Sequence, residues 1–146
     1  MYHQSLVGIN KSTLDLIIGF EGYRERAYQD TKGLWTIGVG HLIKSNEGHL
    51  LSEILTREQV YDMLEDDLRD CDAAINEFIH VPLNQNQYNA LCSLCFNIGV
   101  DHFRDSSVVR HLNQKNYAQA ADDFLMWDKP SVLLPRRHKE RDIFLA

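Results

Sequence analysis

Glu21 is the acidic residue whose place in the sequence best suits proton transfer. Leu14, Ile17 and Ile18 follow the i, i+3, i+4 spacing of an amphipathic helix, and Glu21 takes the next position of that apolar stripe, just before Gly22. A carboxyl group held against apolar surroundings keeps its proton to higher pH, as a general acid requires. A helix end that frays into water would explain the position equally well, so both interpretations stay open.

Two more polar residues lie in a segment that alternates like a strand. Asp30 opens a turn that ends at Gly33, where aspartate also has a local use, because its side chain accepts hydrogen bonds from nearby backbone amides. Thr36 would share one strand face with Gly38 and Gly40. Glycines in strands often mark a close approach by another group. This nearly bare face suits a polysaccharide chain, with ordinary β-propensity as the alternative for Thr36.

The cysteines do not indicate a metal or disulfide site. The chain has 3 cysteines, an odd number that argues against a fully paired framework. Cys92 and Cys95 spell C-x-x-C inside an apolar helical run, and no second pair stands at zinc-like spacing. We interpret them as buried packing residues, since a free cysteine behaves as a small hydrophobe. We predict no metal and no cofactor.

The elements that would carry Glu21, Asp30 and Thr36 come early in the chain. A helix is predicted to begin at residue 12 or 13 and to end at Gly22. The apolar period then changes to two, which predicts a β-hairpin over 27–40. The polar stretch Ser45–His49 is predicted to be a loop.

A long helix is predicted over 57–79. Thr56 and Gln59 form a capping-box pattern at its start. Its apolar stripe runs down to a break at Pro82 and comprises Val60, Leu64, Leu68, Cys71, Ile75 and Phe78. The other face is acidic, and we interpret it as solvated: Glu58, Asp62, Glu65, Asp66, Asp67, Asp70 and Asp72.

The rest of the chain is predicted to be helical. Asn84 and Gln87 open a helix that is apolar nearly all round and ends at Gly99, which places it in the centre of a core. Shorter helices follow around 107–112 and 117–127, and the last begins after Pro135.

The predicted fold class is α+β, mainly helical, in one domain over 1–146. A small lobe over 12–55 would hold the only β structure, and an all-helical lobe would cover 80–146. The helix 57–79 would join the two lobes, with the cleft between them.

Composition and charge exclude several classes of function. With 44% hydrophobic and 25% charged residues the chain is an ordinary globular protein. Its 15 Lys+Arg and 21 Asp+Glu give a net charge of −6, which argues against nucleic acid as a partner. No window is long and apolar enough for a membrane span, and Met1–Lys11 lacks a signal-peptide core, so we expect synthesis in the cytoplasm.

The segment from Phe20 to Leu42 resembles a known family. It contains the pattern F-E-G-x-R-x-x-A-Y-x-D-x-x-G-x-W-T-I-G-V-G-H, which is similar to the phage-type muramidases, the lysozyme family of phage endolysins. The resemblance continues in Leu83–Gly99, Phe103–Asn113 and Pro135–Arg141, so it covers nearly the whole chain.

This resemblance implies a lysozyme-like two-lobe fold and a peptidoglycan hydrolase. The family cuts the β-1,4 bond between N-acetylmuramic acid and N-acetylglucosamine. Matched to this chain, Glu21 is the general acid, Asp30 positions or activates the attacking water, and Thr36 places a hydroxyl beside that water. Because a water attacks rather than a side chain, the resemblance also implies inversion at the anomeric carbon.

The resemblance further implies a set of substrate-binding residues. Leu42, Phe96 and Ser107 match positions that line the cleft. Arg137 matches an arginine close to the catalytic glutamate, and the alternative is that it is one of several surface bases on the last helix. The connection 128–135 departs from the family because it contains no glycine, and the net negative charge is unusual for an enzyme that approaches an anionic wall.

Three other functions compete with a muramidase. A lytic transglycosylase cleaves the same bond with a glutamate but no water, and Asp30 and Thr36 argue against it. A wall-binding or assembly module would have lost the three candidate residues. A helical DNA-binding protein, suggested by the turn at Gly99, would carry more basic residues after that turn.

The expected partner is the glycan strand of peptidoglycan. We expect a monomer with no nucleic acid and no stable membrane association, which acts on the cell wall in the periplasm. A holin or a secretion apparatus would deliver it there.

Overall fold

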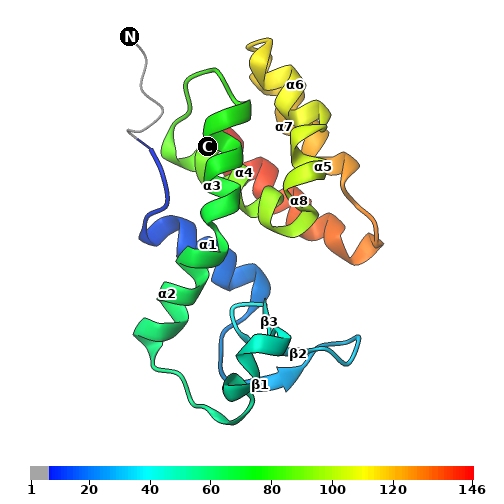
Figure 1. The fold of residues 1–146 in the computed structure, drawn as a ribbon. Coiled ribbons are helices and arrows are strands. Elements are labelled where there is room, and N and C mark those ends of the chain that lie inside the picture. Colours follow the sequence, from blue (N-terminus) through cyan, green and yellow to red (C-terminus); the bar gives the residue numbers. More distant parts are fainter. Residues whose placement is uncertain (1–6) are drawn as a thin grey trace. The chain divides into compact units, whose positions relative to one another are not determined.

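The computed structural model describes residues 7–146, which fall into two compact units (Figure 1). We call Leu14–Asp67 the sheet unit, and residues 7–13 with Leu68–Ala146 the helical unit. The fold is mainly helical with a small antiparallel sheet, as the sequence predicts. Part of Met1–Lys11, the segment on which the prediction of cytoplasmic synthesis rests, lies outside the described residues. Within the described range, no helix has the length and apolar character needed to cross a membrane.

The sheet unit contains the predicted first helix and hairpin. The three strands are antiparallel in the order β1-β2-β3. The elements are α1 (Lys11–Glu21, which starts in the helical unit), β1 (Arg24–Gln29), β2 (Trp35–Gly38), β3 (His41–Leu42), the 3-10 segment η2 (Ser45–Ser52) and α2 (Arg57–Asp67). Strand β3 is an addition to the predicted hairpin.

The prediction of a loop over Ser45–His49 is wrong, because these residues begin the 3-10 segment η2. The side chain of Glu47 accepts a hydrogen bond from the backbone N–H of Lys44 at 3.0 Å, which caps the segment. Leu50 anchors it by burial. A polar stretch containing a glycine conceals both features from a reading of the sequence.

The predicted continuous helix over 57–79 is two helices, α2 and α3 (Arg69–Phe78). The interruption is at Leu68, whose ψ of −6° departs from the helical value. It directly follows Asp67, whose carboxylate binds His41 of β3. A tertiary contact of this kind leaves no trace in the apolar period. The predicted capping box is confirmed, since Thr56 and Gln59 exchange hydrogen bonds of 2.8 and 3.1 Å.

The helical unit is built around α4 (Gln85–Ile98), as predicted. Asn84 and Gln87 form its capping box, and all residues from Tyr88 to Cys95 are buried. Its other elements are α3, α5 (Val100–Arg104), α6 (Ser107–Asn113), α7 (Tyr117–Asp123), the 3-10 turns η3 (Phe124–Met126) and η4 (Ser131–Leu133), and α8 (Leu134–Leu145). The short α5 and η4 were not predicted.

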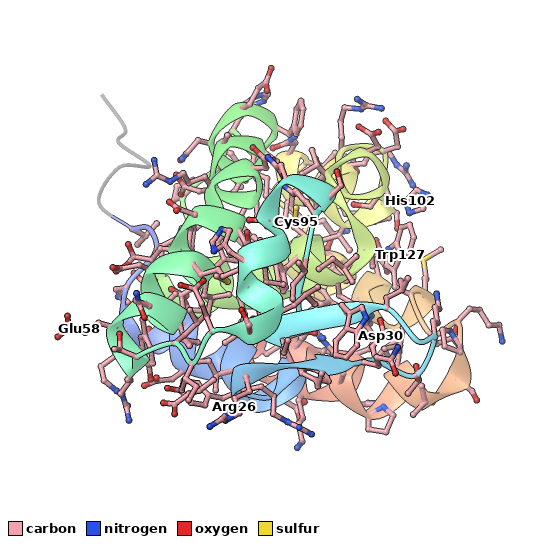
Figure 2. The ribbon with its side chains drawn as sticks, turned by 60° about the horizontal axis from the view of Figure 1, so that its bottom comes forward. Arg26, Asp30, Glu58, Cys95, His102 and Trp127 are labelled. Carbon is pink, nitrogen blue, oxygen red and sulfur yellow. The ribbon has the colours of Figure 1, made fainter. Side chains whose placement is uncertain are left out.

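The cysteines are buried, which confirms their interpretation as packing residues. Cys71, Cys92 and Cys95 are all free thiols in the core of the helical unit, and Figure 2 marks Cys95. Burial raises the pKa of the Cys92 thiol well above its ordinary value, so it is chemically inert at neutral pH.

Candidate active site

Glu21 is held at the carboxyl end of α1 by the glycine that terminates the helix. Gly22 has φ +86°, a left-handed conformation that suits glycine, and its N–H donates to the carbonyl of Ile18 at 2.8 Å. Glu21 is half-buried. The helix end is therefore well formed, and the alternative of a frayed end that points into water does not describe it.

The carboxylate of Glu21 lies against the backbone of Gly40. A β-carbon added to Gly40 would stand 3.2 Å from Oε1 of Glu21, closer than ordinary van der Waals contact. Gly40 also has φ +67°. A glycine here thus meets two demands, a left-handed backbone and room for Glu21. The sequence predicted that another group approaches these strand glycines, and at Gly40 that group is the candidate acid itself.

Asp30 lies where the hairpin turns (Figure 2). Its Oδ1 accepts hydrogen bonds from the backbone N–H groups of Lys32 at 2.8 Å and Leu34 at 2.9 Å. The local use of aspartate in a turn is therefore real. Both bonds use the same oxygen, so Oδ2 is the oxygen that can orient a water molecule.

Thr36 is buried, with only 3% of its surface exposed. Its hydroxyl donates to the carbonyl of Leu34 at 3.0 Å, which leaves the oxygen's lone pairs to accept from a neighbour. The prediction of a bare, open strand face is wrong. Glu21 covers Gly40, and near Gly38 the side chains of Met63 and Val60 lie within van der Waals reach of the space that a β-carbon would occupy.

Of the residues predicted to bind substrate, Leu42 lies in the same unit as the three candidate catalytic residues. It pairs directly with Thr36 across β2 and β3 and is 51% exposed. Phe96, Ser107 and Arg137 belong to the helical unit. Phe96 is half-buried on α4, and Ser107 begins α6 with its hydroxyl 3.4 Å from the sulfur of Met126.

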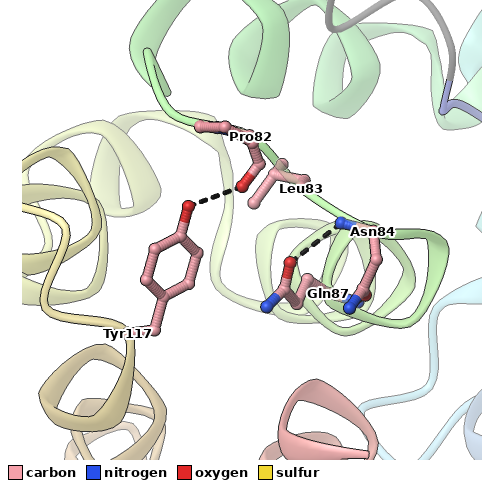
Figure 3. Close-up of a pocket in the computed structure, with 5 residues that line it drawn as sticks. All are labelled: Pro82, Leu83, Asn84, Gln87 and Tyr117. Carbon is pink, nitrogen blue, oxygen red and sulfur yellow. Dashed lines mark hydrogen bonds between the residues drawn. The ribbon is translucent and has the colours of Figure 1, made fainter.

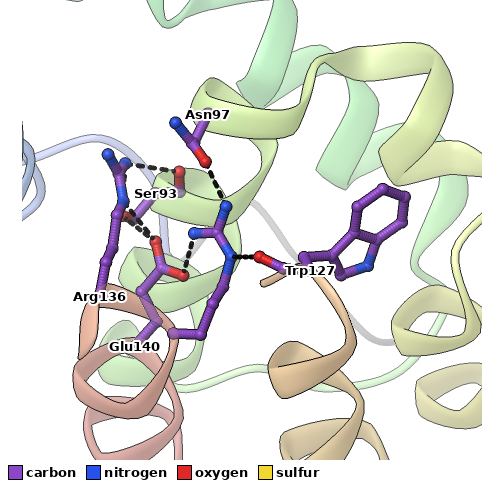
Figure 4. Close-up of polar contacts among 6 residues, drawn as sticks. Ser93, Asn97, Trp127, Arg136 and Glu140 are labelled. Carbon is purple, nitrogen blue, oxygen red and sulfur yellow. Dashed lines mark hydrogen bonds and ion pairs between the residues drawn. The ribbon is translucent and has the colours of Figure 1, made fainter. Parts of the chain in front are cut away.

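Arg137 is fully buried, so the alternative of a surface base on the last helix is wrong. Its Nε donates to the carbonyl of Trp127 at 2.7 Å, its Nη1 to Glu140 at 2.8 Å, and its Nη2 to Asn97 (Figure 4). Sequence reasoning missed Glu140. The signal for it was the i, i+3 spacing of an arginine and a glutamate on one helix.

We expect Gly40→Ala to reduce wall-lysing activity by roughly tenfold to a hundredfold. The added methyl group would displace the Glu21 carboxylate, and a shift of about 1 Å at a reacting group is enough for a loss of this size. Activity per folded molecule, measured on purified peptidoglycan, checks the expectation. Gly99→Ala is the matched control, because Gly99 has φ +93° but no atom near the added carbon. Equal activity losses in the two variants would show that backbone strain alone is responsible.

His41 is the centre of a second polar cluster in the sheet unit. It is only 8% exposed, and its ring nitrogens lie 2.8 Å from Asp67 Oδ2 and 3.0 Å from Glu47 Oε1. Burial disfavours the charged ring, but the hydrogen bonds and charges of the two carboxylates outweigh it and raise the pKa of His41.

The interpretation of a fully solvated acidic face is wrong at Asp67 and also at Asp72, which accepts a hydrogen bond from Tyr88 at 2.5 Å.

The raised pKa of His41 predicts that the protein loses stability as the pH rises. Protonated His41 is favoured in the folded state, so its contribution is complete below the ordinary pKa of about 6.5 and disappears as the pH passes the raised folded value. Denaturant unfolding at a series of pH values measures this slope. His41→Asn should flatten it, while His49→Asn, at an exposed pair with Glu53, should leave it unchanged. A slope that survives in His41→Asn would contradict the assignment.

A small hollow lies in the helical unit at the start of α4 (Figure 3). Pro82, Leu83, Asn84, Gln87 and Tyr117 line it. The Tyr117 hydroxyl donates to the carbonyl of Pro82 at 2.6 Å, and Asn84 and Gln87 cap each other. These polar groups hold the loop and the helix start together.

Across the described residues, no group of His, Cys, Asp and Glu side chains has an arrangement that could hold a metal ion.

The chain matches known proteins over most of its length. A model of the phage lysozyme family matches residues 18–140. The endolysin of Salmonella phage P22 is 50% identical over 131 residues, covering 86% of this chain and 90% of that protein. A mutant of P22 lysozyme superposes with a TM-score of 0.85 at 44% identity, covering 94% of this chain and 98% of that one. The muramidase domain of SpmX from Asticaccaulis excentricus has a TM-score of 0.81 at 35% identity, covering 95% of this chain and 98% of that one.

These matches have the same fold and extend through both units, including the segment that carries Glu21, Asp30 and Thr36. The chain therefore belongs to the phage lysozyme family.

Proposed function

We propose that this protein hydrolyses the β-1,4 bond between N-acetylmuramic acid and N-acetylglucosamine, with Glu21 as general acid. Membership of the phage lysozyme family makes the protein a lysozyme-type glycoside hydrolase that degrades peptidoglycan. The observation that supports Glu21 most directly is its carboxylate against Gly40, in the sheet unit that also contains Asp30 and Thr36.

In the proposed reaction, Glu21 gives its proton to the glycosidic oxygen as the bond to the anomeric carbon breaks. A water molecule attacks that carbon from the opposite side of the sugar ring. Oδ2 of Asp30 accepts one proton of this water, and the lone pairs of the Thr36 hydroxyl accept a hydrogen bond from it. The water's proton passes to Asp30 and its hydroxide to the anomeric carbon, so one water is consumed and two sugar ends result. Asp30 then releases its proton to solvent and Glu21 takes one up, which restores both groups for the next turnover.

This mechanism predicts inversion at the anomeric carbon. A water held by Asp30 and Thr36 attacks the face opposite to the leaving group, so a β-linked substrate gives an α-anomer first. Proton NMR of the product formed within the first minutes distinguishes the two outcomes. An initial β-anomer would contradict inversion and would assign Asp30 the role of a nucleophile.

The products of peptidoglycan digestion also test the competing functions. A muramidase leaves N-acetylmuramic acid at a free reducing end, which borohydride converts to the alcohol. A lytic transglycosylase leaves a 1,6-anhydro end that borohydride does not reduce. A wall-binding module without catalysis would leave the glycan intact. Mass spectrometry of the reduced fragments therefore decides among the three.

Binding and delivery complete the proposal. Leu42, Phe96, Ser107 and Arg137 are the proposed substrate-binding residues, and the buried Arg137 side chain is held by its hydrogen bond to the carbonyl of Trp127. The protein acts on the cell wall as a monomer, and a holin or a secretion apparatus brings it there. Size-exclusion chromatography with light scattering tests the monomer.

A further inference from the structure

Tyr28 lies beside Thr36 on the sheet. The strand register pairs Tyr28 with Thr36 across β1 and β2, and Thr36 with Leu42 across β2 and β3. Directly paired residues point to the same face, with β-carbons about 4.5–5.5 Å apart. Tyr28, Thr36 and Leu42 therefore form one row across all three strands, which we call the Thr36 row.

The Tyr28 ring is fixed by an arginine. The Arg24 guanidinium carbon lies 4.7 Å from the ring centroid, in cation–π geometry. Both residues belong to β1, with a register irregularity between them, and it is the cation–π contact that brings Arg24 over the Tyr28 ring. The ring thus has a defined position next to Thr36 although it is only half-buried.

The Tyr28 hydroxyl differs from those of the other tyrosines. The hydroxyls of Tyr23, Tyr61, Tyr88 and Tyr117 all donate to a protein acceptor. Over residues 7–146, Tyr28 is the one tyrosine whose hydroxyl makes no hydrogen bond to the protein. A phenol hydroxyl both donates and accepts, so this one is available to a ligand.

A second arginine–tyrosine pair in the sheet unit shows the contrast. Arg57 lies 5.1 Å from the centroid of Tyr61, and its Nη2 donates to the Tyr61 hydroxyl at 3.1 Å. The Tyr61 hydroxyl in turn lies 3.5 Å from Asp15. That pair satisfies its own polar groups and holds α1 to α2. The pair of Arg24 and Tyr28 has the same stacking but leaves its hydroxyl unused.

We propose that Tyr28 contacts the substrate: its hydroxyl hydrogen-bonds a hydroxyl or acetamido group of the sugar bound beside Thr36, and Arg24 is a positioning residue that holds the ring for this contact. The proposal rests on the proposed function, since it requires a glycan of N-acetylated sugars at the Thr36 row. The row then combines a ring, a hydroxyl and the exposed aliphatic side chain of Leu42, which together suit a sugar with polar edges and apolar faces.

Kinetics of Tyr28→Phe on soluble glycan strands from peptidoglycan test the proposal. Loss of one neutral hydrogen bond should lower kcat/KM about three- to tenfold. Tyr61→Phe is the matched control and should stay within about twofold of wild type. Thermal unfolding of each variant separates activity from folding. A Tyr28→Phe variant with wild-type kcat/KM would overturn the contact.

Arg24 is tested by a series that separates positioning from bulk structure. Arg24→Met should lower kcat/KM to a similar extent as Tyr28→Phe, and Arg24→Lys should restore part of it because a lysine also stacks over the ring. Adding Arg24→Met to Tyr28→Phe should cause little further loss, since both act through one hydroxyl. Independent, multiplying losses would overturn the positioning role.

A binding measurement separates this inference from the proposed function. In a Glu21→Gln background, cosedimentation with insoluble peptidoglycan gives a Kd without turnover. Adding Tyr28→Phe should raise that Kd about three- to tenfold, and adding Tyr61→Phe should not. If wild type fails to degrade peptidoglycan, the proposed function fails, but the Kd comparison still decides the role of Tyr28. An unchanged Kd together with an unchanged kcat/KM rejects the Tyr28 contact alone.

Discussion

Glu21→Gln should abolish wall lysis while the protein stays folded. The amide has nearly the same shape as the carboxyl group, so the contact with Gly40 and the end of α1 should persist. It cannot deliver a proton to the leaving oxygen, and general acid catalysis typically contributes about 10²–10⁴-fold to the rate. The decrease in turbidity of a purified peptidoglycan suspension measures the loss.

Circular dichroism and thermal unfolding must accompany that assay, because a misfolded variant would lose activity for another reason. Glu25→Gln is a matched control, since Glu25 follows in the same segment and bonds the Tyr23 hydroxyl at an exposed site. A folded Glu21→Gln protein that keeps more than about a tenth of wild-type activity would contradict the role of Glu21.

The local structure around the candidate catalytic residues could be predicted because short-range patterns report local structure, whereas their proposed roles come from the family resemblance. The apolar stripe of α1 placed Glu21 at its end, and the turn at Asp30 confirms a motif that uses neighbouring backbone amides. The capping box of Asn84 and Gln87 likewise fixed the start of α4. Each of these signals involves residues no more than about four positions apart, where backbone geometry dictates the outcome.

Contacts between distant segments could not be predicted. The approach of Glu21 to Gly40 joins the end of a helix to the residue before β3, and its only trace in the sequence is a glycine. The pairing of His41 with Asp67 joins β3 to α2, and the break at Leu68 directly follows it. Apolar periodicity predicts which face of a helix or strand is buried, but it does not predict which polar side chain from another segment contacts that face.

Arg137 shows the same limit in a basic segment. Four basic residues close together on the last helix favour a solvated surface, and most charged residues are indeed exposed. The structure instead buries Arg137 against three acceptors, which are Asn97 on α4, Trp127 just after η3, and Glu140 on α8. Burial of an arginine is tolerable when every donor finds a partner. The sequence contained those partners, but their convergence is a property of the packed helices.

The partner of Arg137 leads to the largest expected effect on stability. Glu140 is fully buried, and its two oxygens accept from Arg137 at 2.8 Å, Arg136 at 3.1 Å and Ser93 at 2.5 Å (Figure 4). Glu140→Leu would remove the one carboxylate between two arginine side chains that are 0% and 10% exposed. The variant would then bury two arginine side chains that have lost the carboxylate they share.

We expect Glu140→Leu to lower the free energy of unfolding by about 3–5 kcal/mol, the range for a buried pair that loses one partner. Urea denaturation followed by circular dichroism measures it. Asp122→Leu is the matched control, because Asp122 of α7 pairs at an exposed site with Arg141, which lies on α8 like Glu140. This variant should lose less than about 1 kcal/mol of unfolding free energy. Equal losses in the two variants would contradict the argument, since burial is what makes the loss of a shared carboxylate costly.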